Sequence, residues 1–365
     1  METIALVAPF PNPHFLEIFN SPVFTKTFNV DRYCFRSLPA HRQGLGWDEA
    51  SFVKLSSSYL KIPATQKAVK DYSTVIYYGA IDPRCIPAAM MWCSLRRGQK
   101  TFLATEGLRF RQSSLGSKGF GLLLNHPKLE ILAIGHQCAD DFRQAGLTKP
   151  KYRKYGFFEN YPTHVQYQPS TDDICRILSV GQLIDRKNFL SIVYSLQRIA
   201  NRSAKRISYT ICGEGVQRPE LESEIRKLPK HIEVNLLGNC NSEELERCFR
   251  SADIFAMPSK YDGWGVVLNQ AIHFQLPVIV SNGVRAARDY LVQNGFNGFI
   301  FDSDIKLDEG LAKLVSDEEL RSRFSYNSRE IADVWHIDSV AGNLARVILE
   351  KEPQRASEFF PLGEI

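Results

Sequence analysis

The feature that most constrains the fold is a regular alternation in the second half of the chain. From Arg176 onward, short runs rich in β-branched and other apolar residues alternate with longer amphipathic runs. Strands separated by helices pair in parallel, because each helix carries the chain back across the sheet. The expected strands are 177–181, 207–212, 232–237 and 253–257, and the expected helices follow Asn188 and cover 219–228, 241–251 and 266–276. The pattern predicts a doubly wound parallel α/β sheet with ligands at the carboxyl ends of its strands.

The first half shows the same rhythm more weakly, with strand-like runs at 4–8, 74–79, 101–104 and 129–135. A chain of 365 residues exceeds one ordinary core, since domains average roughly 150 residues. We therefore predict an N-terminal domain at 1–165 and a C-terminal domain at 172–345. The stretch from Glu159 to Asp173 holds two prolines and shows no period, and we expect it to be the linker.

Composition indicates a globular protein, with 44% apolar and 11% aromatic residues. Residues 1–165 hold 21 Lys and Arg against 12 Asp and Glu, a net charge of +9, and the remaining residues hold 24 against 28, a net charge of −4. A basic first half suits an acidic membrane surface or an anionic acceptor, or is simply a solvated surface. The eight cysteines are scattered and include no Cys-x-x-Cys pair, which is typical of reduced core residues in a cytoplasmic protein.

The stretch 258–281 has the strongest functional signal. Gly263 and Gly265 allow a tight turn after the strand 253–257, and a helix is expected from Val266 until Pro277 stops it. Free amides and the helix dipole attract anions at such a helix start. Gln270 lies four residues after Val266, about one turn or roughly 5.4 Å along the same face. The stretch predicts a diphosphate site with a ribose beside Gln270.

This stretch resembles the signature of retaining family-4 glycosyltransferases, which have the GT-B fold. The shared pattern is Pro-Ser, an acidic residue, Gly-aromatic-Gly, a second anchor after seven intervening residues, and then Pro-Val-Ile-Val-Ser. The family usually has glutamate at both anchors, whereas this chain has Asp262 and Gln270. The resemblance implies two Rossmann-like doubly wound domains that face across a cleft, with the acceptor bound by the domain at 1–165 and the nucleotide sugar bound by the domain at 172–345. It also implies that the tail, 346–365, crosses back to the first domain.

The resemblance assigns roles to individual residues. Ser179 to Asn188 is similar to the family's loop after the first strand of the donor domain: Lys187 aligns with the family lysine, Gln182 takes the place of a common arginine, and Arg186 is expected to supply the missing cation. Lys187 and Arg186 would stabilise the leaving diphosphate, and Asp262 would hold the donor sugar. These three are the candidate catalytic residues. The expected donor-binding residues are Gly181, Gln182, Gly213, Asn239, Gly263, Trp264, Gly265, Val266 and Gln270.

Plainer interpretations stand beside these roles. Asp262 also suits a turn before Gly263, Gln270 suits a helix flank, and 185–187 suits a solvated turn. We expect the Trp264 side chain to pack in the core. Glu106 and His136 each follow an expected strand in the first half and are candidates for acceptor or sugar contacts, or have structural roles.

Two further segments of the first half are notable. Residues 10–14 stand where the family often has a glycine-rich loop, but they contain no glycine. The mixture of cations and aromatics at 149–158 is compatible with a membrane or nucleic-acid contact, but an edge strand is the favoured interpretation.

Together these features predict a metal-independent, retaining glycosyltransferase of the hexosyltransferase type. It would use a nucleotide-diphosphate sugar and a glycan or glycolipid acceptor, with no cofactor, no metal site and no nucleic-acid partner. The implied setting is polysaccharide, lipopolysaccharide or glycolipid assembly in the cytoplasm or at the inner face of the membrane, with peripheral contact through the basic half. The alternatives are a catalytically inactive GT-B module that binds a nucleotide or glycan, and a nucleotide-sugar epimerase. No motif identifies the nucleobase, the sugar, the acceptor or the oligomeric state.

Overall fold

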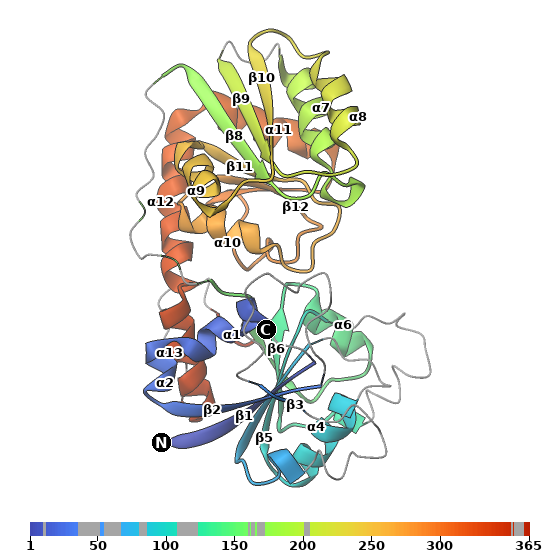
Figure 1. Ribbon diagram of the computed structural model, residues 1–365, viewed down its shortest axis with the longest axis vertical. Helices are drawn as coiled ribbons and strands as arrows, with labels where there is room; N and C mark the ends of the chain where they lie inside the picture. The colour runs from blue at the N-terminus through green and yellow to red at the C-terminus, as the bar shows by residue number, and fades with distance from the viewer. Residues whose placement is uncertain are drawn as a thin grey trace. The chain divides into compact units, whose positions relative to one another are not determined.

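The chain folds into two units, each a parallel sheet with helices packed against it (Figure 1). The computed structural model describes residues 1–9, 12–35, 52–54, 67–79, 86–107, 123–159, 161, 165, 172–200, 205–351, 353 and 361–365. Unit 1 comprises residues 1–160 and 334–365, and unit 2 comprises residues 161–333. The predicted α/β class is confirmed.

The units divide the chain differently from the predicted domains. The first boundary follows Asn160, within the expected linker, most of which lies outside the described residues. The second boundary falls at Val334 rather than at residue 345, so the last helix, α13 (Ile337–Ile348), belongs to unit 1. Packing is the reason: α13 buries Val340 and Leu344, and Ser21 of unit 1 donates a 2.6 Å hydrogen bond to its Asp338.

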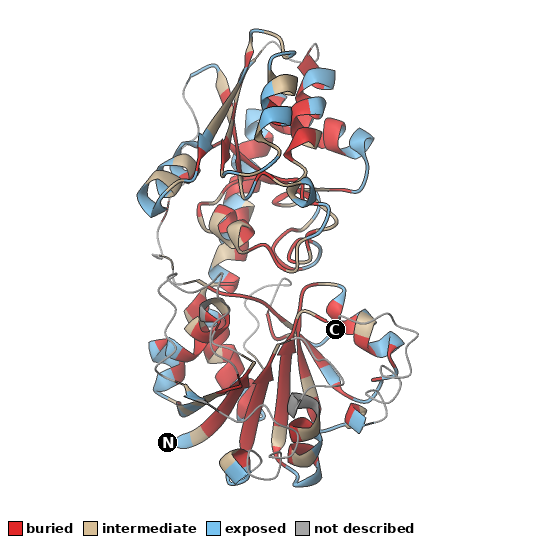
Figure 2. Cartoon of the chain, turned by 45° about the vertical axis from the view of Figure 1, so that its right-hand side comes forward, coloured by how far each residue is buried: buried red, intermediate tan, exposed pale blue. Residues whose placement is uncertain are grey.

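The sheet of unit 1 has seven parallel strands in the order β3-β2-β1-β4-β5-β6-β7. These are β1 (Glu2–Ala8), β2 (Phe28–Cys34), β3 (Val53–Lys54), β4 (Thr74–Tyr78), β5 (Lys100–Thr105), β6 (Leu129–Ile134) and β7 (Lys151–Tyr155). The central strands are almost wholly buried (Figure 2), as expected for a sheet covered on both faces. The four strand-like runs expected in the first half are confirmed as β1, β4, β5 and β6.

Helices cover the two faces of this sheet with different side chains. On one face, α1 (Pro13–Asn20), α2 (Pro22–Thr25) and α13 pack together, and the Phe19 and Phe24 rings meet edge to face at 5.3 Å. The other face is covered by α4 (Ile86–Arg96) and α6 (Cys138–Gln144), which bury Met90, Met91 and Phe142 (Figure 1).

The segment 149–158 contains the edge strand β7, in agreement with the favoured interpretation. Residues 361–365 run antiparallel beside this strand, where Leu362 N–H donates to the Lys154 carbonyl and Ile365 N–H donates to the Tyr152 carbonyl. The chain end thus covers main-chain groups that an edge strand would otherwise expose.

The sheet of unit 2 has six parallel strands in the order β10-β9-β8-β11-β12-β13. These are β8 (Ile174–Val180), β9 (Arg206–Cys212), β10 (Ile232–Gly238), β11 (Ile254–Met257), β12 (Val278–Ser281) and β13 (Gly298–Phe301). Renumbered from its first strand, this is the 3-2-1-4-5-6 order of a dinucleotide-binding sheet. The chain leaves β8 toward one side and enters β11 from the other, so the topological switch point lies between these two neighbours.

The helices expected in unit 2 are confirmed as α7 (Phe189–Ile199), α8 (Arg218–Ile225), α9 (Ser242–Ser251) and α10 (Val266–His273), and a 3-10 turn, η3 (Asp185–Lys187), precedes α7. Two further helices, α11 (Asp304–Ser316) and α12 (Glu318–Val334), were not among those expected. The Asn241 side chain accepts from the Glu244 amide at 3.0 Å, and Glu244 accepts in return from the Asn241 amide at 2.8 Å. This capping box fixes the start of α9.

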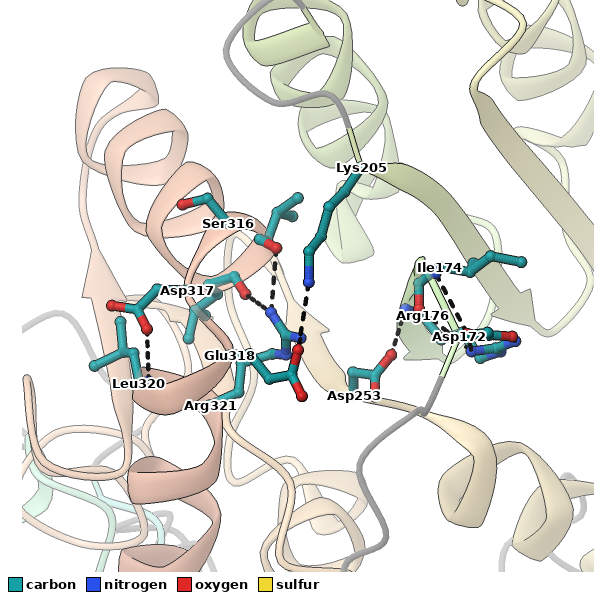
Figure 3. A network of polar contacts seen from close by, with 12 residues as sticks. Asp172, Ile174, Arg176, Lys205, Asp253, Ser316, Asp317, Glu318, Leu320 and Arg321 are labelled. Atoms are coloured by element: carbon teal, nitrogen blue, oxygen red, sulfur yellow. Dashed lines mark hydrogen bonds and ion pairs between the residues drawn. The ribbon is translucent and has the colours of Figure 1, made fainter.

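A network of polar contacts ties helices and strands together at the amino end of this sheet (Figure 3). The buried Asp253 carboxylate accepts from the Arg176 N–H at 2.7 Å. The guanidinium of Arg321, also buried, donates to the carbonyls of Leu314 and Val315 at 2.8 and 3.1 Å. These are the last carbonyls of α11, which lack partners within their own helix. Asp253 and Arg321 therefore support the fold through main-chain groups, and the ion pairs Arg176–Asp172 and Lys205–Glu318 add side-chain contacts to the network.

The cysteines of the described ranges are free thiols, and Cys85 lies outside those ranges. Cys212 donates to Cys248 with the sulfurs 3.6 Å apart. Burial raises the pKa of both thiols, which keeps them protonated.

No helix in the described ranges combines the length and the apolar composition that crossing a bilayer requires.

Candidate functional site

Three loops at the carboxyl end of the unit 2 sheet are joined by their backbones. Gly213, after β9, donates to the Gly238 carbonyl at 2.7 Å, and Gly181, after β8, donates to the Cys212 carbonyl at 2.9 Å. A β-carbon on Gly213, whose φ is +147°, would lie 2.0 Å from the Gly181 oxygen. Glycine is therefore required here, because the two backbones approach more closely than a side chain allows.

A second close approach starts helix α10. Gly265 has a φ of +94°, and a β-carbon there would lie 2.5 Å from the Met257 side chain. The helix then begins at Val266, as the sequence predicted. The first amides of a helix have no partners within it and carry the positive end of its dipole. The strand-to-helix turn after β11 is thus suited to bind an anion.

The loops after β8 and β11 bring the candidate catalytic residues together. Lys187 Nζ lies 2.6 Å from Asp262 Oδ2, and their side chains are only 14% and 15% exposed. Arg186 Nη1 lies 3.4 Å from the same oxygen and donates to the Tyr261 carbonyl at 2.8 Å. Since β8 and β11 flank the switch point, two cations and one carboxylate meet where doubly wound sheets bind their ligands.

The turn after β12 holds the backbone of Asp262, a role that the sequence reasoning missed. The Asp262 N–H donates to the Gly283 carbonyl at 3.0 Å, and the Arg285 N–H donates to the Asp262 carbonyl at 3.1 Å. A β-carbon on Gly283 would lie 2.2 Å from the Lys260 oxygen. The pair Asn282-Gly283 is a turn signal that could have drawn attention to this support.

The other residues of the 258–281 stretch take different positions. Trp264 is 2% exposed, its Nε1 donates to Asn269 at 2.7 Å, and its ring meets Tyr290 edge to face. The indole is therefore part of the core, and a donor contact would have to come from the backbone amide of Trp264. Gln270 is half-buried on α10, one turn beyond Val266.

The remaining expected donor contacts lie around the same edge of the sheet. Gln182 is exposed after Gly181, and Asn239 is exposed directly after β10. Gly263 is half-buried between Asp262 and Trp264. All of these positions follow β8, β10 or β11, so the fold collects at one edge residues that are distant in the sequence.

In unit 1, Glu106 and His136 follow the neighbouring strands β5 and β6, and both are half-buried. Cys138 joins the two strand ends by donating to the Thr105 carbonyl at 3.2 Å. Residues 10 and 11 of the segment 10–14 lie outside the described residues. His14 Nδ1 is 3.3 Å from Glu159. The strand ends thus place both candidates at one edge of the sheet of unit 1.

Within the described ranges, no group of three His, Cys, Asp or Glu side chains is arranged to hold a metal ion. Lys187 and Arg186 place their cationic side chains against Asp262 in the turn after β11. The chemistry that this arrangement offers is charge stabilisation by fixed cations, helix amides and one carboxylate.

Comparison with known sequences agrees with this geometry. Residues 165–331, nearly all of unit 2, match the family model of Glycosyl transferases group 1. The chain is 27% identical over 150 residues to the amylovoran biosynthesis glycosyltransferase AmsD of Erwinia amylovora, covering 41% of each chain. It is 26% identical over 231 residues to the capsular polysaccharide biosynthesis glycosyltransferase CapM of Staphylococcus aureus, covering 63% of this chain and 57% of CapM. The chain thus spans about half the length of these curated relatives.

Solved structures resemble the chain over almost its whole length. Anabaena HepE, in complex with UDP, has a TM-score of 0.68 at 15% identity and covers 96% of this chain and 100% of HepE. The lipopolysaccharide outer core galactosyltransferase WaaB, in its apo form, also has a TM-score of 0.68 at 15% identity, with 94% and 99% covered. These likenesses show the fold, and the predicted GT-B architecture of two α/β domains is confirmed.

Proposed function

We propose that this protein is a retaining, metal-independent glycosyltransferase of the hexosyltransferase type. It transfers a sugar from a nucleoside-diphosphate sugar to a hydroxyl group of a glycan or glycolipid. One observation carries the proposal: Lys187 and Asp262, 75 residues apart in the sequence, meet at 2.6 Å at the switch point of a dinucleotide-type sheet. The match of residues 165–331 to Glycosyl transferases group 1 supports the same chemistry.

The cations act on the leaving group. When the bond between the sugar C1 and the diphosphate oxygen breaks, about one additional negative charge develops on the diphosphate. Lys187, Arg186 and the first amides of α10 stabilise this charge, because they are already in place before the bond breaks. The acceptor oxygen bonds to C1 on the face that the diphosphate leaves, and its proton passes to the departing phosphate oxygen. This path retains the configuration and requires neither a side-chain base nor a metal.

We assign the other contacts with the nucleotide-sugar donor from the positions of residues around the same edge of the sheet. Asp262 accepts hydrogen bonds from the sugar hydroxyls, and Gln270 binds the ribose as both donor and acceptor. Gly181, Gly213 and Gly265 let the backbone approach the phosphates, as their positive φ angles and close contacts indicate.

The proposed class of acceptor is inferred by analogy with the similar proteins. AmsD and CapM are named for amylovoran and capsular polysaccharide biosynthesis, and WaaB is named as a lipopolysaccharide outer core galactosyltransferase. We propose a related glycan or glycolipid acceptor, with Glu106 and His136 among its contacts. We also propose a cytoplasmic location, where the basic residues of 1–165 meet the acidic inner face of the membrane.

The decisive experiment is release of nucleoside diphosphate. A thermal-shift screen of UDP-, GDP-, ADP- and TDP-sugars selects donors, which are then incubated with glycan and glycolipid acceptors. Lys187→Ala should lower kcat/KM at least ~10-fold, or ~1.4 kcal/mol of transition-state stabilisation. Lys227→Ala, at an exposed lysine in the turn after α8, is the matched control and should leave kcat/KM unchanged. Activity should persist in excess EDTA.

Other outcomes select the alternatives. Donor binding without release under any condition would support an inactive binding module. Conversion of the sugar nucleotide into an isomer without use of an acceptor would support an epimerase. Unchanged kinetics of Lys187→Ala would remove Lys187 from the site, and complete loss of activity in EDTA would contradict the metal-independent path.

A further inference from the structure

The charged groups of the ion pair between Lys187 and Asp262 differ in how many hydrogen-bond partners they have. Asp262 Oδ2 accepts from Lys187 at 2.6 Å and faces Arg186 at 3.4 Å. Its second oxygen, Oδ1, has no hydrogen-bond donor in the part of the chain that the structure describes. Arg186 is also held by the Tyr261 carbonyl at 2.8 Å. Within that part, the hydrogen bond and ion pair of Lys187 Nζ are with Asp262 alone, so Lys187 is the cation that can move without breaking another polar contact.

The space around Lys187 also favours movement. Its side chain passes Gly181, where a β-carbon would lie 3.3 Å from Lys187 Cε and 3.5 Å from Cδ. Without that β-carbon, the lysine stem has room on the side of the loop that follows β8. The ammonium carries three donor hydrogens and is not tied to one fixed direction.

Binding of a diphosphate changes what each charge requires. The carboxylate repels the phosphates, and it competes with them for Lys187. If Lys187 turns to the diphosphate, Asp262 is left partly buried, at 15% exposure, with fewer donors than before. Burying a carboxylate without donors is unfavourable. The hydroxyls of a donor sugar supply new donors to Asp262, whereas a nucleoside diphosphate without its sugar supplies none.

We propose that Lys187 and Asp262 form an exchange pair that distinguishes a nucleotide sugar from the nucleoside diphosphate left after transfer. This inference rests on the proposed function. When the complete donor binds, Lys187 moves to the diphosphate and the sugar hydroxyls replace it at Asp262. After transfer the sugar is gone, Asp262 recovers Lys187, and the diphosphate loses its cation. Asp262 thereby promotes product release as well as holding the sugar.

The test is the binding of UDP, GDP, ADP and TDP, with and without an attached sugar, to the full chain. Asp262→Asn removes the charge but keeps the shape. It should tighten binding of the nucleoside diphosphate about 10-fold, or about 1.4 kcal/mol, because Lys187 no longer has a competing partner. The same change should lower kcat and strengthen product inhibition. Asp262→Glu, which retains the charge, should preserve the wild-type preference for the sugar nucleotide.

The matched control is Asp185→Asn. Asp185 lies in the same turn as Lys187 but pairs with the exposed Lys260 at 2.6 Å, so its loss changes the net charge without touching the exchange pair. In Asp185→Asn, the affinities for the nucleoside diphosphate and for the sugar nucleotide should both stay within about twofold of the wild type. Asp262→Ser provides a second neutral variant, with the same expected tightening, if Asp262→Asn melts at a lower temperature.

The outcomes separate the exchange from the activity. Equal weakening of both ligands by both neutral variants would show that Asp262 only supports the loop, and it would overturn the exchange while leaving a glycosyltransferase intact. Tightened diphosphate binding in a protein that releases no product from any donor would support the exchange in a binding module and contradict the proposed function.

Discussion

The two ends of the unit 2 sheet both keep charged side chains largely out of water, but they satisfy those charges differently. At the amino end, Asp253 and Arg321 are 1% and 4% exposed and bind main-chain groups (Figure 3). At the carboxyl end, Lys187 and Asp262 are somewhat more exposed and bind each other. A main-chain partner cannot leave without disrupting a strand or helix, whereas a side-chain partner can be replaced by a ligand. The difference teaches which buried charges stabilise the fold and which remain available for chemistry.

The largest effect on stability and nucleotide affinity is expected at Gly213, where two backbones at the carboxyl end of the unit 2 sheet are in close contact. Gly213→Ala would place a β-carbon 2.0 Å from the Gly181 carbonyl oxygen, at a φ of +147°. Overpacking and backbone strain together should lower the free energy of unfolding by about 2–5 kcal/mol. Nucleotide affinity should fall at least ~100-fold, since two loops of the candidate site are displaced together. Urea unfolding and calorimetric titration measure both effects.

Gly295→Ala is the control for Gly213→Ala. Gly295 has a φ of +80°, but a β-carbon there would meet nothing within 4 Å. This variant should show only the strain, about 1–2 kcal/mol, with unchanged affinity. Equal losses in the two variants would mean that the contact between the Gly213 and Gly181 loops is unimportant.

A smaller effect, on stability alone, is expected when Arg321 is replaced at the amino end of the unit 2 sheet. Arg321→Met leaves the carbonyls of Leu314 and Val315 without their donor in a buried position. The free energy of unfolding should fall by about 2–4 kcal/mol, since each unsatisfied buried group costs about 1–3 kcal/mol. Nucleotide affinity should be unchanged. A weaker affinity in the folded variant would erase the distinction between the two ends of the sheet.

The control for Arg321→Met is Arg323→Met on the same helix, where the side chain is exposed. Its effect on the free energy of unfolding should stay within about 0.5 kcal/mol. A similar loss in both variants would attribute the effect to helix α12 as a whole rather than to the carbonyls that Arg321 binds.

The smallest effect is expected at Gln270. Gln270→Ala removes one neutral hydrogen-bonding side chain from α10, and such a bond contributes about 0.5–1.5 kcal/mol. KM for the donor should rise about 2- to 12-fold, with kcat little changed, as steady-state kinetics will show. Gln270→Glu, which introduces the second glutamate of the glycosyltransferase signature that this stretch resembles, should keep the wild-type KM or improve it. An unchanged KM in Gln270→Ala would leave only the first anchor, Asp262, in the site.

Much of unit 2 could be predicted from the sequence because its signals are local. The capping box of Asn241 and Glu244 and the start of α10 after Gly265 each depend on residues within a few positions. The strand β2 was missed in unit 1. Its interior residues are mostly partly exposed or exposed, so the continuous apolar run that marks the central strands is absent. The short edge strand β3 offers only two residues to a pattern search.

The domain boundary near the C-terminus could not be predicted from local signals. Helix α13 (Ile337–Ile348) spans the boundary that was predicted at residue 345. Amphipathicity indicates that one face of a helix is buried but not which sheet buries it. The contacts of α13 with α1 and α2 join residues more than 300 positions apart, and no local pattern encodes that pairing.

The sequence by itself determined the class of this protein: its strand and helix periods define two doubly wound domains, and its glycines and turn residues predict an anion site after β11. The tertiary structure alone decided how the site is charged. It placed Lys187 and Asp262 within 2.6 Å, and it anchored Arg186 to the carbonyl of Tyr261. Periodicity is set by neighbours along the chain, whereas the pairing of charges 75 residues apart depends on the order in which strands join a sheet.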